Sequence, residues 1–337
     1  MKIEIITSKN ADLKESGFGS VLACNEVLAS VKLMGHSGRV TQCESLNDLK
    51  NVVHRNPDLV ILAAKYMPVE GGDDVWFSDY FAQNHITFSG SSRETLKYDS
   101  DKVLAKERLA SLGIKTAKYF TAIPGEYKVE AGLPFSFPLF LKPTDAANGN
   151  GVDDQSIVEN FHQFEAKVFS LYEIYKQPVL VEEYLGGREF TVAVMKSDSG
   201  RMSISAIELA PPISSGTLRI LGAAVKMQDT EILKEITLDD IDLVMDIARL
   251  SFHGLGARGF ARIDVKMDNK GVCYFMEANL VPGMNRGTSY FPEACEIANE
   301  ISYDDVVQLM LDESFSRAAT KQTFNIVPEL EVAMCVV

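Results

Sequence analysis

The chain has few cysteines, and they follow no recognisable pattern. The 337 residues include only five cysteines, an odd number at scattered positions: Cys24, Cys43, Cys273, Cys295 and Cys335. Because no CxxC pair or Cys/His cluster occurs, the sequence indicates neither a disulfide framework nor a zinc site. This cysteine usage is typical of a reducing compartment, so we expect a cytoplasmic protein.

An excess of positive charge and long hydrophobic runs are also missing. The 33 Lys and Arg residues are outnumbered by 47 Asp and Glu residues, which gives a formal net charge of −14. Since general nucleic-acid binding needs clustered basic residues, we expect no nucleic-acid partner. No stretch approaches the roughly 18 uninterrupted apolar residues of a membrane helix, and the start MKIEIITS is unlike a signal peptide. We therefore expect no membrane partner either.

The chain does contain alternating short apolar strands and helical patterns, which indicate an α/β fold. In the first third, KIEIITS, PDLVILAA and HITFSGS read as strands of a mostly parallel sheet, and a helix ends at Gly35. DKVLAKERLASLG reads as a helix capped by Ser100 or Asp101. Residues 238–256 carry a helical apolar stripe. The strands FTVAVMK, MSISAIELA, FARIDVKMD and VCYFMEANL lie close in sequence, which favours antiparallel pairing.

The most specific local pattern is ARIDVKMDNKGVCYFMEANLVPGMNRG, residues 261–287. DNKG is a good turn, and we expect it to place Met267 opposite Val272. Side chains alternate between the two faces of a strand, so this register puts four polar residues on one face. They are Arg262, Asp264, Glu277 and Asn279, with Arg262 opposite Glu277 and Asp264 opposite Phe275. A shift of one residue in the pairing would break the set.

The composition of that face matches the coordination chemistry of Mg²⁺. Two carboxylates and one amide oxygen are hard ligands, and water and phosphate can complete an octahedron. The arginine beside them could neutralise a developing oxyanion, and the PGM turn that follows offers a glycine N–H. The alternative is a solvated hairpin face with an Arg262–Glu277 cross-strand pair, and the spacing alone leaves both interpretations open.

A candidate phosphate site lies in LKPTDAANGNGV, which runs from Leu141 to Val152. Lys142 closes the apolar strand PLFLK, and Gly149 and Gly151 follow. Glycine lets backbone N–H groups approach a ligand closely, which suits an anion. This loop therefore predicts a phosphate contact.

The sequence resembles the D-alanine–D-alanine ligase branch of the ATP-grasp superfamily over residues 1–312. The resemblance rests on DKVLAKERLASLGI, FPLFLKP, VLVEEYLGGREFTVAV, GFARIDVKMD and MEANLVPGM, in this order. It implies a three-domain α/β (α+β) fold of the ATP-grasp type. The expected parts are a Rossmann-like N-terminal domain at 1–95, a central lid domain at 96–185, a C-terminal ATP-grasp domain at 186–315 and a tail at 316–337.

The same resemblance implies an ATP-dependent reaction between two small molecules. A carboxylate substrate is phosphorylated to an acyl phosphate, an amine substrate attacks it, and ADP and phosphate are released. The charge on the transferring group calls for a metal and nearby cations. We expect two Mg²⁺ ions, with Mn²⁺ as an alternative, and a homodimer on family precedent.

The resemblance also carries individual residues over to the nucleotide site. These are Lys102 and Lys142 at the phosphates, Glu182 and Leu185 at adenine, Glu189 at the ribose and Lys226 in the ω-loop. Two of them have structural alternatives, because Lys102 could be a surface lysine and Glu189 could form a strand-end salt bridge with Arg188.

The remaining residues implied by the resemblance bind metal or the reacting groups. The metal ligands are Asp264, Glu277 and Asn279, and the oxyanion is held by Arg262 and the backbone of Gly283. Ser289 and Tyr290 lie where the family binds the acceptor carboxylate, although NRGTSY has one extra residue. Glu15 matches a catalytic glutamate of the N-terminal domain.

Three departures from the family fall at amino-acid-binding positions. DAANGNG replaces a serine-rich EGSS loop, so Asn148 stands where the first serine falls. In GAAVKMQD, Lys226 fits the ω-loop but Met227 replaces a tyrosine, and Ala64 and Lys65 occupy the neighbourhood of a usual histidine. Because the nucleotide and metal positions are intact, we predict a ligase whose substrates differ from two D-alanines.

Three other interpretations remain open. The first is a divergent D-alanine–D-alanine ligase of cell-wall synthesis, which Glu15, Arg262 and the PGM turn favour. The second is a nucleotide-binding protein without ligase activity. The third is a dinucleotide-binding oxidoreductase, because GFGSVL follows a strand and partly matches GxGxxG, although the third glycine is absent.

Overall fold

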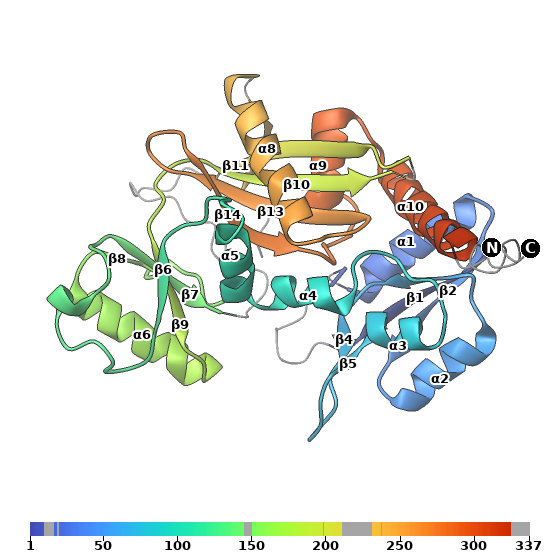
Figure 1. Cartoon of the computed structure of the whole chain (residues 1–337), viewed down its shortest axis with the longest axis horizontal. Coiled ribbons are helices and arrows are strands. Elements are labelled where there is room, and N and C mark those ends of the chain that lie inside the picture. The colour runs from blue at the N-terminus through green and yellow to red at the C-terminus, as the bar shows by residue number, and fades with distance from the viewer. Residues whose placement is uncertain are drawn as a thin grey trace, which may run out of the picture.

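Figure 1 shows the computed structural model of the chain. The structure describes residues 1–9, 17–18, 20–144, 150–197, 199–210, 231–236 and 238–324. Three of the predicted site residues lie outside the described residues: Glu15, Asn148 and Lys226.

The N-terminal part is built on a three-stranded sheet in the order β2-β1-β3, and its strands are parallel, as the sequence predicts. Its strands are β1 (Lys2–Ser8), β2 (Ser37–Cys43) and β3 (Leu59–Leu62), with helices α1 (Val21–Leu33), α2 (Leu46–Arg55) and α3 (Phe77–Gln83) and the short pair β4 (Tyr66–Met67) and β5 (Val75–Trp76). The expected strand at 85–91 is reduced to one parallel bridge between Val60 and Phe88. Sequence analysis missed β2, because its burial does not alternate clearly.

The central part is a four-stranded sheet in the order β6-β9-β7-β8, drawn at the left of Figure 1 with α6 beside it. Its elements are β6 (Tyr119–Ala122), β7 (Leu139–Pro143), β8 (Ile157–Val158), α6 (Phe161–Tyr175) and β9 (Val179–Glu183), together with the short turn of 3₁₀-helix at Glu130–Gly132. Leu141, Val181 and Phe164 belong to the hydrophobic core between sheet and helix. This packing holds Lys142 and Glu182 on adjacent strands, with Lys142 paired to Leu180 in register.

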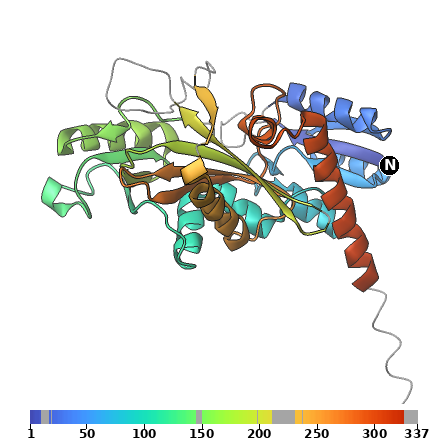
Figure 2. The ribbon, with the colours of Figure 1, turned by 90° about the horizontal axis from the view of Figure 1, so that it is seen from above.

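The C-terminal part is a five-stranded sheet in the order β12-β11-β10-β13-β14, and its β10–β11, β10–β13 and β13–β14 pairs are antiparallel, as predicted. The elements are β10 (Glu189–Lys196), β11 (Met202–Ala210), β12 (Ile232–Glu235), α8 (Leu238–Gly254), β13 (Phe260–Met267), β14 (Cys273–Asn279), α9 (Tyr290–Asn299) and α10 (Tyr303–Phe324). Figure 2 shows α8 below this sheet. On the other face, Phe291 of α9 packs beside Phe260.

Two consecutive helices connect these parts across the middle of Figure 1: α4 (Arg93–Ser100) and α5 (Lys102–Ala110). The Asp101 side chain caps α5 by accepting a hydrogen bond from the Leu104 N–H at 2.9 Å, which decides between the two predicted caps. Both helices pack against β14. The proposed domain boundaries at 95, 185 and 315 stay a prediction.

The first residues of the predicted tail continue the last helix. Helix α10 continues to Phe324 and packs against α1, so residues 316–324 are helical. The reason is that this segment is polar but contains no glycine or proline to end a helix.

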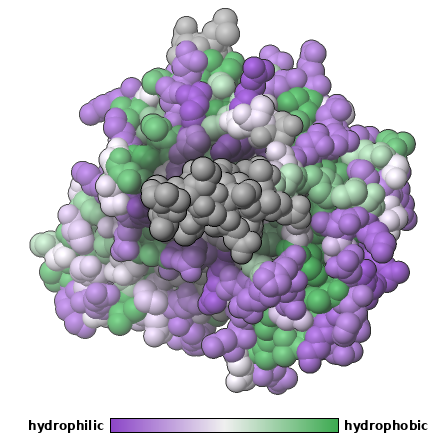
Figure 3. Space-filling model, turned by 45° about the vertical axis from the view of Figure 1, so that its right-hand side comes forward, coloured by the Kyte–Doolittle hydropathy of each residue, from purple (hydrophilic) through white to green (hydrophobic). Residues whose placement is uncertain are grey.

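The outer surface of the described chain is mixed in character. Figure 3 shows one face on which hydrophilic residues predominate and smaller hydrophobic areas lie between them. Among the helices of the described residues, none combines the length and hydropathy that crossing a membrane requires.

Candidate active site

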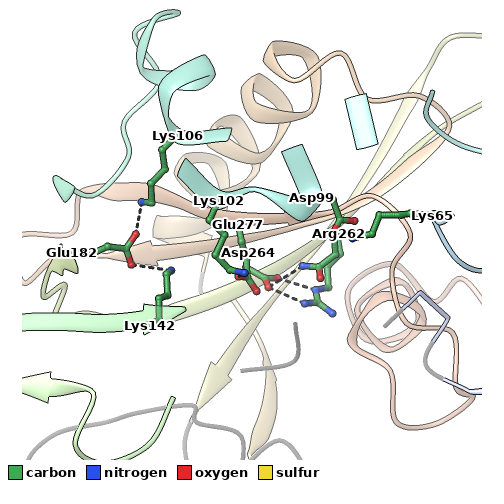
Figure 4. Close-up of polar contacts among 10 residues, drawn as sticks. Lys65, Asp99, Lys102, Lys106, Lys142, Glu182, Arg262, Asp264 and Glu277 are labelled. Carbon is green, nitrogen blue, oxygen red and sulfur yellow. Dashed lines mark hydrogen bonds and ion pairs between the residues drawn. The ribbon is translucent and has the colours of Figure 1, made fainter. Parts of the chain in front are cut away.

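The carboxylate hairpin forms, but with a register that differs from the predicted one. Near the turn Met267 pairs with Cys273 and Val265 with Phe275, and the register then shifts at a bulge. Beyond the bulge Asp264 lies opposite Glu277, and Arg262 lies opposite Asn279. The predicted pairs were therefore wrong: the pairing is shifted by one residue at the turn itself, and a bulge that inserts Met276 into β14 adds a second one-residue shift. The same bulge restores all four polar residues to one face, as Figure 4 shows for three of them.

Asp264 is the most tightly held carboxylate of this face. Its side chain accepts two hydrogen bonds from Arg262, both at 3.0 Å, and one from the Thr191 hydroxyl at 2.7 Å. Asn279 Nδ2 lies 3.4 Å from the same carboxylate. Asp264 is only 5% exposed, so the alternative of a solvated face with an Arg262–Glu277 pair is wrong. Burial alone would lower the pKa of Arg262, but Asp264 outweighs it and raises that pKa, which keeps the guanidinium charged.

Lys102 approaches the hairpin from the first turn of α5. Its Nζ lies 3.8 Å from Glu277 Oε2, and its side chain is buried. Burial lowers the pKa of Lys102, although the Glu277 charge opposes the effect. The interpretation of Lys102 as a surface lysine is therefore wrong, and the structure brings it to the carboxylates (Figure 4).

A second buried cluster joins the central sheet to α5. Glu182 Oε1 lies 2.6 Å from Lys106 Nζ, and Glu182 Oε2 lies 2.8 Å from Lys142 Nζ (Figure 4). All three side chains are buried. Burial raises the pKa of Glu182, but the two ammonium groups outweigh it and lower the pKa to about 2. Glu182 is therefore ionised at neutral pH and fixes the position of Lys142.

Lys106 was not among the predicted site residues, although its spacing from Lys102 in the sequence indicates a shared helix face. In DKVLAK, Lys106 follows Lys102 by four residues, which places both on one face of the helix. A second lysine with its side chain fully buried requires a carboxylate partner, and Glu182 supplies it.

Replacing Glu182 with glutamine is expected to lower stability in a pH-dependent way. A carboxyl group whose pKa falls from 4.5 to about 2 on folding stabilises the protein above pH 4.5, and this contribution disappears as the pH falls toward 2. At neutral pH, the free energy of unfolding of the wild type should exceed that of Glu182→Gln by on the order of 3 kcal/mol. This difference should be smaller at about pH 3.5. Urea denaturation at both pH values measures it, with the exposed Glu165→Gln as control. A difference that does not change with pH would contradict this role.

The other predicted nucleotide residues lie on the neighbouring strand ends. Leu185 is buried just after β9, at the connection to β10. Glu189 accepts a hydrogen bond from Lys266 at 2.9 Å. The predicted alternative partner, Arg188, pairs instead with Glu208 and Asp240, so that strand-end salt bridge does not form.

Gly283, Ser289 and Tyr290 lie together at the start of α9. A Cβ atom at Gly283 would meet Ser289 Oγ at 2.8 Å, so a larger residue here would displace the Ser289 side chain. Ser289 Oγ accepts a hydrogen bond from the Asn285 N–H at 2.9 Å. The Tyr290 hydroxyl donates to Glu231, and its ring centroid lies 5.5 Å from the Arg262 guanidinium. These contacts place Tyr290 beside Arg262 and Gly283 beside Ser289.

The donors on the hairpin face suit a divalent metal. Among the described residues no three His, Cys, Asp or Glu side chains cluster in a way that could hold a metal ion. The candidate set is therefore two opposed carboxylates, Asp264 and Glu277, and the amide oxygen of Asn279. Hard oxygen ligands with room for water and phosphate fit Mg²⁺ rather than a soft-ligand metal.

Comparison with known proteins identifies the family to which this arrangement belongs. The family model described as D-ala D-ala ligase C-terminus matches residues 109–312, more than half of the chain. The chain belongs to the D-alanine–D-alanine ligase family. The matched segment includes β7, β9, β13 and β14, and thus Lys142, Glu182 and the hairpin carboxylates.

Individual members of the D-alanine–D-alanine ligase family align along much of the chain. The D-alanine–D-alanine ligase of Gloeobacter violaceus is 27% identical over 318 residues, 93% of this chain and 99% of the relative. That of Alcanivorax borkumensis is 31% identical over 216 residues, 64% of this chain and 65% of the relative. The crystal structure of the Bacillus anthracis ligase complexed with ATP superposes with a TM-score of 0.74 at 20% identity, covering 95% and 99% of the two chains, and supports the fold.

Membership in the D-alanine–D-alanine ligase family resolves part of the sequence interpretation. The protein has the ATP-grasp fold and is an ADP-forming ligase that makes carbon–nitrogen bonds, using ATP and a divalent metal. The interpretations of GFGSVL as part of an oxidoreductase, and of the chain as a binding protein without activity, are therefore wrong. Neither accounts for the match over residues 109–312.

Proposed function

We propose that the protein is a D-alanine–D-alanine ligase, which uses ATP to join two D-alanine molecules. The observation that carries this proposal is the alignment with the Gloeobacter violaceus ligase over 99% of that protein's length. The structure supports it with a hairpin on which Asp264, Glu277 and Arg262 converge. The sequence interpretation that favoured other substrates is thereby ranked second.

The proposed nucleotide site lies between the central and C-terminal sheets. Lys102 and Lys142 would contact phosphate oxygens, and their burial and their electrostatic interaction with Glu277 support this role. Glu182 and the Leu185 backbone would meet adenine, and Glu189 the ribose. In this scheme Lys106 keeps Glu182 ionised and oriented.

The proposed metal ligands are Asp264, Glu277 and Asn279, with two Mg²⁺ ions and Mn²⁺ as a possible replacement. The metal would neutralise charge on the transferring phosphoryl group. Arg262 is already oriented by Asp264, so it can face a developing oxyanion without reorganisation. The Gly283 N–H, held close to Ser289, is the second proposed oxyanion donor.

The acceptor end of the site is proposed to include Ser289 and Tyr290. Tyr290 packs against Arg262, and burial together with Glu231 raises its pKa, so the hydroxyl stays protonated and can donate hydrogen bonds. We also propose a cytoplasmic homodimer, as the sequence resemblance implies. Sedimentation of the purified protein measures whether it is a dimer.

A ligase with a different substrate pair is the second candidate. Lys65 stands near the position of a usual histidine and is buried in an ion pair with Asp99, which changes the charge of that region. Such a change would alter which carboxylate or amine the site accepts.

Substrate-dependent release of ADP and phosphate tests the two candidates. With ATP, Mg²⁺ and D-alanine, we expect turnover and a product with the mass of the D-alanine dipeptide. The control is the same assay without amino acid. A panel of L- and D-amino acids and small carboxylic acids should give lower turnover. Turnover with another pair and none with D-alanine would support the second candidate instead.

A further inference from the structure

The residues Lys65 and Asp99 connect the N-terminal part to the turn that follows the metal-binding strand. Lys65 lies between β3 and β4 and is 3% exposed, and its Nζ is 2.8 Å from Asp99 Oδ1. Asp99 lies in the last turn of α4, and its side chain is also largely buried. Figure 4 shows the two side chains pointing toward one another.

The second oxygen of Asp99 binds the backbone beyond β14. Asp99 Oδ2 accepts hydrogen bonds from the Leu280 N–H at 2.6 Å and the Val281 N–H at 3.4 Å. These two residues directly follow the proposed metal ligand Asn279 and precede Gly283. The Asp99 carboxylate therefore holds the short segment that joins the proposed metal ligand to the proposed oxyanion donor.

Asp99 lies close in sequence to Lys102, which makes a second contact with β14. Asp99 precedes Lys102 by three residues, and Lys102 lies 3.8 Å from Glu277 on the same strand β14. The junction of α4 and α5 thus meets the end of β14 at two points. The backbone oxygen of Lys65 also accepts a hydrogen bond from the Phe77 N–H at 3.0 Å, which fixes Lys65 to α3.

We propose that Lys65 is a positioning residue, which pairs with Asp99 so that the Asp99 carboxylate fixes the Leu280–Val281 segment between the proposed metal ligands and the proposed oxyanion donor. Without Lys65, the largely buried Asp99 carboxylate would lose its ion-pair partner and retain only the electrostatic interaction with Lys102, which is unfavourable for a buried charge. Loss of Lys65 would therefore release the segment. Partners that orient metal ligands influence activity strongly, although they do not touch the reacting atoms.

The test compares Lys65→Met with the double variant Lys65→Met/Asp99→Asn. In Lys65→Met we expect kcat to fall by about 10- to 100-fold while the KM for D-alanine changes by less than about threefold. The amides of Leu280 and Val281 should also exchange faster with D₂O. The double variant should regain several-fold of the lost kcat and slower exchange, because the neutral amide oxygen of the introduced asparagine can accept from the Leu280 N–H without a cation.

The matched control is Lys97→Met, a half-buried lysine on the same helix α4 whose side chain is 41% exposed. The activity measurement rests on the proposed D-alanine reaction, but hydrogen exchange of the metal-free protein does not, so failure of one proposal is distinguishable from failure of the other. A raised KM with unchanged kcat and no recovery in the double variant would mean that Lys65 binds substrate. Unchanged exchange at residues 280–281, or equally faster exchange throughout β10, would also overturn the proposal.

Discussion

Replacing Glu277 with glutamine is expected to reduce ligase turnover by about 10²- to 10³-fold, because the variant loses a charge at the centre of the proposed metal site. Glu277 lies opposite Asp264 in the hairpin and is the carboxylate nearest to Lys102. Glutamine keeps the size of the side chain, but it is neutral and cannot balance the positive charge of the metal or of Lys102. The measurement is ADP release as a function of Mg²⁺ concentration.

The control for this variant is Glu235→Gln, an exposed position on β12 of the same sheet. It should behave as wild type in both activity and thermal unfolding. Glu277→Gln should remain folded, because Glu277 is partly exposed and glutamine fits the same space. If saturating Mg²⁺ restored full turnover, Glu277 would serve only metal affinity. If turnover were normal at all Mg²⁺ concentrations, the proposed metal site would be wrong.

Replacing Arg262 is expected to lower turnover by a similar factor. In Arg262→Lys the charge remains, but a lysine cannot reproduce the two parallel hydrogen bonds to Asp264 at 3.0 Å. The cation would no longer be fixed where negative charge develops. We expect kcat to fall by roughly 10²-fold and the KM for ATP to change little, because Arg262 is proposed to act on the transition state.

Arg262→Met extends the same series by removing the charge. It should be less active than Arg262→Lys and also less stable, because it leaves the buried Asp264 without its guanidinium partner. Arg249→Met, at an exposed position on α8, is the matched control. Equal activity of the lysine and methionine variants would mean that charge at this position does not matter, and a raised KM for ATP alone would assign Arg262 to nucleotide binding.

Much of the candidate site could be predicted from short sequence segments. The apolar strand PLFLK predicts that Lys142 ends a buried strand, and alternation predicts that Arg262 and Asp264 share a face. Both expectations depend only on local periodicity, and the structure confirms them. The register of the hairpin was not predictable, because the bulge at Met276 depends on how β14 packs, and a count from the DNKG turn cannot detect it.

Contacts between distant segments were beyond sequence reasoning. Lys106 and Glu182 are 76 positions apart and belong to different elements, so only the fold brings them to 2.6 Å. Lys65, Asp99 and Leu280 also belong to different parts of the sequence, and only the fold brings them into contact. In the sequence, Lys65 is only a departure from the family pattern. In the structure it is a buried cation next to a carboxylate that holds the end of β14.

Sequence alone was enough to predict the α/β class, the antiparallel hairpin and the residue types of the site, because these follow from local periodicity and turn chemistry. The tertiary structure decided which charges meet. Glu182 is shared between Lys106 and Lys142, Arg262 binds Asp264 rather than Glu277, and Lys65 reaches Asp99. Buried charges must be paired, and the available partner depends on the packing of elements that are remote in sequence.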